Sequence, residues 1–221
     1  MKGATILFSE MSPDPDWEGD FNKWYDTHRI PQRMAVPGFL SAQRYRNAER
    51  PNYLALYELA SPAVLESEAY LKVDAQPHAT TRWMLSNVQG QSRYLADQIG
   101  EAVCGGDAGT PLDSPVLYAV FFSVPDERAE EFNRWYDTER VPMLLQCKDW
   151  LMVRRFEVYE GDPQPWTHLA LSYLADMTAL DSPELDAART SEWCRRLSAE
   201  PWFQASYLIF ERYGERFLPE G

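Results

Sequence analysis

The sequence predicts an α+β protein built from two like-folded halves, and three observations lead to this prediction. The segment FNKWYDTHRIP at residues 21–31 recurs as FNRWYDTERVP at residues 132–142, with eight of eleven positions identical. The two copies lie 111 residues apart, which is half of the 221-residue chain. The same succession of strand-like and helix-like patterns surrounds each copy. We therefore expect one domain over residues 1–100, a linker over 101–113 and a second domain over 114–221.

The first half begins with a short β-rich run at residues 4–9, and a helix is predicted over 17–34 after the proline and aspartate residues that precede it. Pro37 and Gly38 end that helix. Strands are predicted over 39–46 and 53–59, around a turn-forming segment. A helical region over 61–86 and a last strand over 88–98 complete the half.

The second half repeats this order. Strands are predicted over 115–124, 150–159, 167–175 and 203–213, and helices over 126–146 and 181–199. Each half therefore reads β-α-β-β-α-β, the pattern of a ferredoxin-like repeat. A four-stranded sheet with helices on one face leaves its other face bare, so we expect the two sheets to pack together within the chain.

Composition and charge exclude several classes of partner. The formal net charge is −13 and no basic run occurs, which argues against nucleic acid and anionic membrane as partners. Three cysteines without CxxC spacing argue against a disulfide framework and for a reducing compartment. No stretch resembles a signal peptide or a membrane span, so we expect a cytoplasmic protein.

The repeated segment supplies the strongest candidate for chemistry. On a regular helix Phe21, Trp24, Tyr25 and His28 share one face, and that face is expected to turn toward the sheet. The second copy has Glu139 in place of the histidine, so the chemistry is expected in the first half only. A histidine on an aromatic face is a plausible acid or base, although a half-buried structural histidine is the alternative.

Pro31 follows this histidine by three residues. Proline lacks an amide hydrogen and clashes with the carbonyl four residues earlier, here that of Thr27. We therefore expect the helix to be disturbed close to His28. The same reasoning applies to Pro142 and the carbonyl of Thr138 in the second copy. The disturbance either makes room for a ligand or sets a kink that leads into the next strand.

Other candidates surround this helix. Arg44 and Tyr25 are predicted to assist His28 by stabilising an anionic oxygen, and an ion pair with an acidic residue is the structural alternative for Arg44. Further side chains are candidates for lining the substrate cavity: Trp24, Phe39, Tyr45, His78 and Trp83. Their second-copy counterparts on the helix are Trp135 and Glu139.

No nucleotide-binding or nucleophile motif occurs in the sequence. GxGxxG, Walker and GxSxG motifs are missing, and three scattered histidines show no metal-ligand spacing. The sequence therefore predicts neither a cofactor nor a metal, and an enzyme would work through one acid or base and a shaped pocket.

The motif FNKWYDTHRIP followed by PGFLSAQRYR resembles the EthD-like group of the dimeric α+β-barrel superfamily, over nearly the whole chain. The resemblance implies pockets between the sheet and helices of each unit, and it assigns the helix histidine of the family to His28. It implies an intramolecular α+β barrel. Relatives include polyketide cyclases, muconolactone isomerase, cofactor-independent monooxygenases and haem enzymes.

These observations leave several functions open. The first is a cofactor-independent lyase or isomerase that moves a proton on an apolar or aromatic, carbonyl-bearing substrate, with His28 as acid or base. The second is a non-catalytic ligand-binding or accessory module. The third is a cofactor-free monooxygenase or a haem protein with His28 or His78 as axial ligand. A small apolar or aromatic molecule is the expected partner, and assembly into a homodimer stays open.

Overall fold

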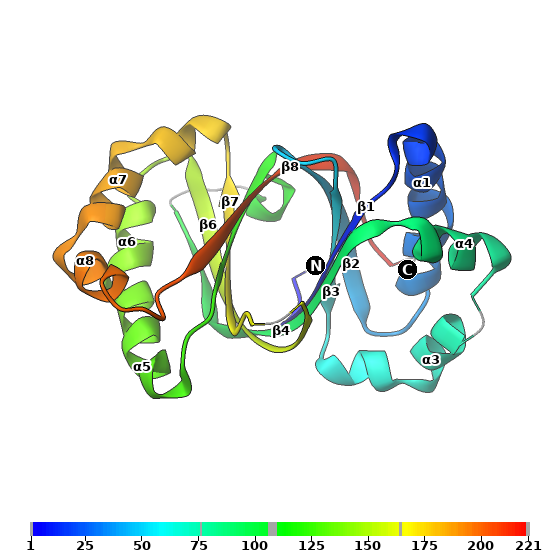
Figure 1. Cartoon of the computed structure of the whole chain (residues 1–221), viewed down its shortest axis with the longest axis horizontal. Coiled ribbons are helices and arrows are strands. Elements are labelled where there is room, and N and C mark those ends of the chain that lie inside the picture. The colour runs from blue at the N-terminus through cyan, green and yellow to red at the C-terminus, as the bar shows by residue number, and fades with distance from the viewer. Residues whose placement is uncertain (1, 76, 106–109, 164, 220–221) are drawn as a thin grey trace. The chain divides into compact units, whose positions relative to one another are not determined.

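The computed structural model describes residues 2–75, 77–105, 110–163 and 165–219 (Figure 1). Contacts divide the chain into two compact units. Unit 1 comprises residues 1–97, 159–163 and 213–221, and unit 2 comprises residues 98–158 and 164–212. This division differs from the predicted one because three long strands pass from one unit into the other: β4 (Gln89–Cys104), β6 (Trp150–Asp162) and β8 (Ala205–Phe217).

Unit 1 follows the order predicted for the first half. Its remaining strands are β1 (Thr5–Ser12), β2 (Phe39–Asn47) and β3 (Tyr53–Leu59). Its helical segments are η1 (Pro15–Trp17), α1 (Glu18–Trp24), η2 (Tyr25–Arg29), α2 (Ile30–Met34), η3 (Pro62–Glu66), α3 (Glu68–Ala75) and α4 (Ala79–Asn87). Figure 1 shows these helices on one face of the unit's strands.

Unit 2 repeats this order. Its remaining strands are β5 (Val116–Phe122) and β7 (His168–Leu174). Its helical segments are η4 (Pro111–Asp113), α5 (Asp126–Trp135), η5 (Tyr136–Arg140), α6 (Val141–Leu144), η6 (Met177–Asp181), α7 (Pro183–Thr190) and α8 (Glu192–Ser198). Residues 101–104 of the predicted linker continue β4, and its residues 106–109 lie outside the described residues.

The strands are hydrogen-bonded in the order β1-β3-β2-β8-β5-β7-β6-β4, which closes into an eight-stranded barrel. The pairs β1–β3 and β2–β3 are antiparallel, and so are their counterparts β5–β7 and β6–β7. In register, Ala55 of β3 lies opposite Ser9 of β1, and Ala170 of β7 lies opposite Val120 of β5. This register allows residues of the two halves to be compared position by position.

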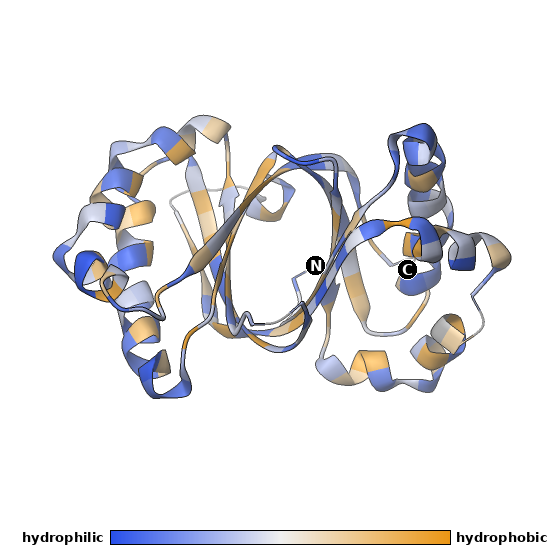
Figure 2. Ribbon diagram, viewed as in Figure 1, coloured by the Kyte–Doolittle hydropathy of each residue, from blue (hydrophilic) through white to orange (hydrophobic). Residues whose placement is uncertain are grey.

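The core of each unit lies between its strands and its helices. In unit 1 the core includes Phe21, Trp24, Phe39 and Tyr57, and in unit 2 a similar cluster forms around Trp135. Figure 2 shows hydrophobic and hydrophilic residues alternating along the strands and helices of each unit, as two-sided elements require. No helix in the described part of the chain is long and apolar enough to cross a bilayer.

The helix predicted over residues 17–34 is not one regular helix. It contains a π-helical turn at Tyr25–Arg29, and the second copy has the same turn at Tyr136–Arg140. The amide of Ile30 donates to the carbonyl of Tyr25, five residues earlier, directly before Pro31. The expected disturbance beside the proline is thus present in both halves. A π turn contains one extra residue, so every later side chain moves to a different face.

Candidate functional site

A hollow of about 640 Å³ lies within unit 1, where β1 and β4 face the helices. We call it the arginine hollow, because two buried arginines of the π-turn helix line it. Its lining residues are Ser9, Met11, Arg29, Arg33, Pro62, Leu65, Glu66, Tyr70, Leu71, Leu85, Gln91, Ser92, Arg93, Leu95, Tyr159, Glu160, Gly161 and Asp162.

Arg33 is the most unusual side chain in this hollow. It is 4% exposed, and its Nε and Nη1 atoms are buried without a hydrogen-bond partner among the described residues. No carboxylate of the described residues forms an ion pair with it. Its guanidinium lies 4.8 Å from the centre of the Tyr57 ring. A buried charge without a counter-ion costs several kcal/mol, and buried donors are normally paired, so this position favours an anionic ligand.

The surroundings keep Arg33 charged. Burial, the largest single influence, lowers its pKa, but the neighbouring Tyr57, Tyr70 and Tyr25, together with a hydrogen bond to Tyr57, more than offset this and raise the pKa above its ordinary value. Arg29 lies beside it, and burial together with the Arg33 charge lowers the pKa of Arg29. Both arginines line the hollow, and the influence of Arg33 on the pKa of Arg29 shows that the two guanidiniums interact.

Tyr57 keeps its proton. Burial is the main cause that raises its pKa, with Tyr25 adding to the effect and both arginines opposing it. Tyr57 is fully buried and does not itself line the hollow, so its ring supports the guanidinium of Arg33 from the core side. The hollow therefore combines a cation without a counter-ion among the described residues and apolar walls such as Leu65 and Leu95.

The π turn explains why sequence reasoning selected the wrong helix residues. A regular helix would place His28 with Phe21 and Trp24, and Arg29 and Arg33 on the flank and outside. Because the turn adds one residue, Arg29 and Arg33 are buried instead. The sequence carried one overlooked signal, since Arg29 recurs as Arg140 whereas Arg33 has a leucine as its counterpart.

The expectation that His28 faces an enclosed cavity is wrong. Its side chain is exposed and does not line the arginine hollow. Its Nδ1 lies 2.6 Å from Oγ1 of Thr27, and that hydroxyl also donates to the carbonyl of Lys23. The imidazole is thus held on the outer side of the π turn.

Arg44 forms an ion pair with an acidic residue, the structural role given above as its alternative. Its Nη1 donates to Asp26 Oδ1 at 2.8 Å and its Nη2 donates to Asn22 Oδ1 at 2.6 Å, so it ties strand β2 to the π-turn helix. Unit 2 has the same arrangement, with Arg155 bound to Asn133 and Asp137. Because both halves contain this clamp and it leaves each guanidinium paired with a carboxylate, Arg44 is not a free oxyanion donor.

The predicted aromatic residues on the helix and on β2 are buried core. The ring of Tyr25 lies 4.8 Å from the guanidinium of Arg44, and Trp24 Nε1 donates to Thr81 Oγ1 at 3.1 Å. Tyr45 and Phe39 are at most 2% exposed. None of these four residues lines the arginine hollow, although Tyr25 is close enough to contribute to the raised pKa of Arg33.

His78 and Trp83 also fall outside the hollow. His78 is exposed and caps α4, its Nδ1 accepting from the amide of Thr80 at 3.3 Å. Trp83 is 48% exposed and packs its ring against Trp17. The expectation that these two residues close the substrate cavity is wrong for this hollow, because α4 turns them toward solvent.

The second-copy residues form a structural link. Glu139 Oε1 accepts hydrogen bonds from Trp135 Nε1 at 3.1 Å and from Ser191 Oγ at 2.6 Å, which connects η5 to α8. The polar residues of the arginine hollow are largely replaced in unit 2. The hollow residues Ser9, Arg33 and Tyr70 have Val120, Leu144 and Leu185 as counterparts. Tyr57, whose ring packs against Arg33, has Ser172 as its counterpart.

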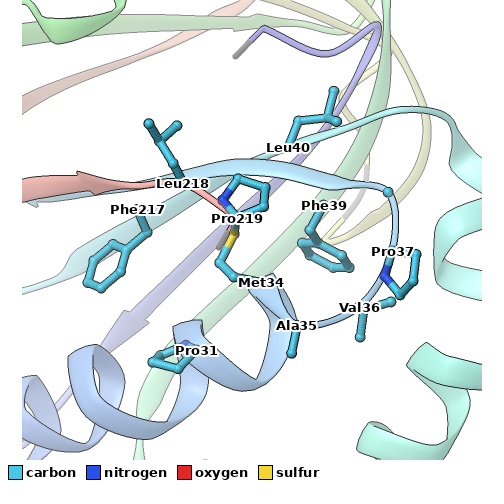
Figure 3. Close-up of a pocket in the computed structure, with 11 residues that line it drawn as sticks. Pro31, Met34, Ala35, Val36, Pro37, Phe39, Leu40, Phe217, Leu218 and Pro219 are labelled. Carbon is cyan, nitrogen blue, oxygen red and sulfur yellow. The ribbon is translucent and has the colours of Figure 1, made fainter. Parts of the chain in front are cut away.

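A second cavity in unit 1, of about 550 Å³, is lined only by apolar residues and glycine (Figure 3). Pro31 and Met34 come from α2, Phe39 from the start of β2, and Phe217 and Leu218 from the end of the chain. Without a titratable or hydrogen-bonding side chain this cavity offers shape but no chemistry. The arginine hollow is therefore the candidate site.

The described residues hold no cluster of three or more His, Cys, Asp or Glu side chains placed to bind a metal ion. A haem held through a histidine does not fit the arginine hollow either. His28 and His78 are exposed, and His168 packs against Phe132 in unit 2. None of the three lines the hollow.

Comparison with known proteins gives the fold. No family model and no curated protein sequence matches the chain. Among solved structures, an anthrone oxidase-like protein is similar over 98% of this chain and 93% of its own, at 13% identity and a TM-score of 0.71. A presumed monooxygenase from Fusobacterium nucleatum subsp. nucleatum is similar over 100% and 97%, at 10% identity and a TM-score of 0.59.

A chlorite dismutase variant from Candidatus Nitrospira defluvii is also similar, over 97% of this chain and 93% of its own, at 8% identity and a TM-score of 0.60. At these identities the likeness concerns the fold alone, and the resemblance to the EthD-like group remains one of sequence motifs. The strand order and these neighbours together show that the chain has the dimeric α+β barrel fold.

Proposed function

We propose that the chain is an enzyme whose site is the arginine hollow, and that it binds a small aromatic molecule as its phenolate or enolate. The observation that carries this proposal is Arg33, a buried guanidinium that lines the hollow and has no counter-ion among the described residues. A hollow of about 640 Å³ suits a ligand of two or three fused rings.

The first step follows from electrostatics. A positive charge close to a phenol or enol oxygen favours its ionised form and lowers the pKa of that group by about one to three. Arg33 therefore stabilises the oxyanion, and the ring of Tyr57 packs against its guanidinium. The proton leaves to water through the mouth, where the exposed side chain of Glu66 lies.

We propose oxidation by dioxygen as the reaction of the bound anion. In an anthrone-type substrate the methylene carbon would gain one oxygen atom as a carbonyl, its two hydrogens leaving with the other oxygen atom as water. The names of the structural neighbours, an anthrone oxidase-like protein and a presumed monooxygenase, support this choice. The lyase or isomerase alternative needs an acid at carbon, and the exposed His28 is not placed to supply one within the hollow.

Binding of 4-nitrophenol tests the first step, because its neutral and anionic forms absorb at different wavelengths. At a pH where the free probe is mostly neutral, the protein is expected to produce the anion's absorbance. Arg33→Leu should abolish this change, whereas Arg46→Leu, an exposed arginine of β2, should preserve it. An unchanged spectrum with the unaltered protein, or equal spectra with both variants, would refute the proposed site.

Anthrone under air tests the second step. Oxygen consumption with formation of anthraquinone, lost in Arg33→Leu and kept in Arg46→Leu, is the expected result. If the probe binds as its anion but neither anthrone nor other enolisable aromatic ketones are consumed, the chain is a ligand-binding module and the oxidase is refuted. A Soret band in the purified protein would contradict the proposal of a haem-free site.

We also propose that each unit is a ferredoxin-like repeat and that the two arose by tandem duplication. The order β4-β1-β3-β2 in the first half matches β8-β5-β7-β6 in the second. The matching π turns and the matching arginine clamps support the same origin.

A further inference from the structure

The tip of the second-half hairpin contributes to the hollow of unit 1. Residues 159–163 follow the second copy of the repeat in sequence, yet they belong to unit 1 by their contacts. Tyr159, Glu160, Gly161 and Asp162 line the arginine hollow. The candidate site is therefore built from both halves of the chain.

Two contacts with β4 hold this tip in place. Arg93 forms an ion pair with Glu160, and the hydroxyl of Tyr94 donates to the carbonyl of Pro163 at 2.9 Å. Arg93 itself lines the hollow. The tip is thus fixed on the strand that borders the site, in a defined position at the mouth.

The hairpin of the first half that corresponds to this one is shorter. Strand β2 has 9 residues and ends at Asn47, whereas β6 has 13 and continues to Asp162. After Asn47 the chain turns back at once, with the Asn47 amide donating to the carbonyl of Asn52 at 2.9 Å. The side chain of Asn47 accepts from the amides of Glu49 and Arg50. The longer hairpin is therefore a feature of the second half alone.

We infer that Tyr159 is a specificity-determining residue that packs on the outer ring of a multi-ring ligand whose anionic oxygen lies at Arg33. This rests on the function proposed above and adds the far end of the ligand to it. Tyr159 is 48% exposed at the mouth, although a large ring gains free energy from contact with another ring. An aromatic ligand that extends from Arg33 to Tyr159 along the hollow would cover this ring, and the inference expects a single-ring ligand at Arg33 to leave it uncovered.

A pair of probes tests this inference. Tyr159→Ala should weaken binding of 4-nitro-1-naphthol about tenfold, the effect of roughly 1.4 kcal/mol, and change binding of 4-nitrophenol less than twofold. Tyr159→Phe should bind both probes as the unaltered protein does. The control Tyr207→Ala removes a tyrosine of similar exposure in unit 2 and should change neither affinity. Equal weakening of both probes, or of neither, would overturn the role of Tyr159.

These readings separate the two proposals. The anion absorbance reports on Arg33 and should persist in Tyr159→Ala with both probes at saturation. Suppose that Arg33→Leu leaves the anion absorbance intact, while Tyr159→Ala still weakens binding of the two-ring probe only. The proposed function is then refuted, and the role of Tyr159 in ligand binding is supported. If Arg33→Leu abolishes the absorbance and Tyr159→Ala shows no discrimination, the reverse holds.

A measurement without ligand keeps the inference testable even if no probe binds. Ser9 is a buried residue of the hollow, so Ser9→Cys places a thiol in the wall of the hollow, in a chain where the exposed Cys104 is changed to Ser. N-ethylmaleimide should label this thiol severalfold faster when Tyr159→Ala or Glu160→Gln is added, and at an unchanged rate with Tyr207→Ala. Equal rates in all four proteins would show that the tip does not cover the hollow.

Discussion

Arg33 shows how a single residue separates the two halves of this chain. The helix that carries it is nearly identical in both copies up to Pro31, and two residues later one copy has arginine where the other has leucine. Leu144 packs into an apolar core, whereas Arg33 keeps two nitrogen atoms without partners. A protein retains such a residue at the expense of stability when the residue serves a ligand.

This difference predicts the effect of a substitution on stability. Arg33→Leu should raise the free energy of unfolding by about 1 kcal/mol or more, because it removes the desolvation penalty of an unpaired charge and leucine is accommodated at the equivalent position of unit 2. Urea unfolding of both proteins measures this effect. Arg46→Leu, an exposed site, should stay within about 0.5 kcal/mol. A clear loss of stability in Arg33→Leu would mean that the guanidinium is structurally paired.

His168 gives a prediction about pH. Burial first, and then the charge of Arg155, lower its pKa to about 4. The unfolded chain binds the proton with a pKa of about 6.5, so it takes up more protons than the folded chain between these values. Stability should therefore fall as the pH drops from about 7 to 4, by at most about 3 kcal/mol from this residue. His168→Gln should remove that part of the slope in urea unfolding at several pH values; identical slopes would contradict the buried neutral imidazole.

At the scale of elements, the π turn decides which residues reach the site. Hydrophobic spacing places residues on a helix only if each contributes the same rotation. The turn at Tyr25–Arg29 breaks that rule by one residue, and its cause, Pro31, was visible in the sequence. The arginine clamp then holds the altered helix on the sheet, because Arg44 binds residues on both sides of the turn's start.

The clamp predicts that removing its carboxylate lowers stability far more than removing another acidic side chain of the same helix. Asp26→Ala should lower the free energy of unfolding by about 3 kcal/mol, because it leaves the guanidinium of Arg44, 1% exposed, without its carboxylate. Asp20→Ala, an exposed acidic residue on the same helix, should cost no more than about 0.5 kcal/mol. Thermal or urea unfolding compares the two. Equal effects would show that the clamp does not hold the helix.

Most of the element order was predictable, since strand alternation, the Pro37-Gly38 break and the repeat itself are local signals. Helix α2 ends at Met34, and Gly38 has a left-handed backbone with φ of 100°, which agrees with that break. The site was predicted less well. A face assignment fails after a π turn, as it did for His28, and the partner of Arg44 depends on tertiary contacts. The reach of the hairpin tip near Tyr159 has no local signal at all.

At the scale of the whole molecule, the two units share one element order but differ in the residues at equivalent positions. Unit 1 has polar residues lining its hollow at Ser9, Arg33 and Tyr70, and unit 2 has aliphatic residues at all three equivalent positions. The second half of the sequence contributes to the site in another way, through residues 159–162 of its long hairpin, which belong to unit 1 by their contacts. The first half of the sequence thus supplies the charge of Arg33, and the second half supplies residues 159–162 of the lining.

This divergence predicts one ligand per chain. Isothermal titration of 4-nitro-1-naphthol should give a single class of sites with a stoichiometry of one, because Leu144 leaves unit 2 without the unpaired cation that the anion requires. Arg33→Leu should remove all of the binding heat, and Leu144→Ala should remove none of it. A stoichiometry of two, or binding that survives in Arg33→Leu, would show that the second half has kept or acquired a site of its own, and that loss of charge at this helix position does not determine which half binds.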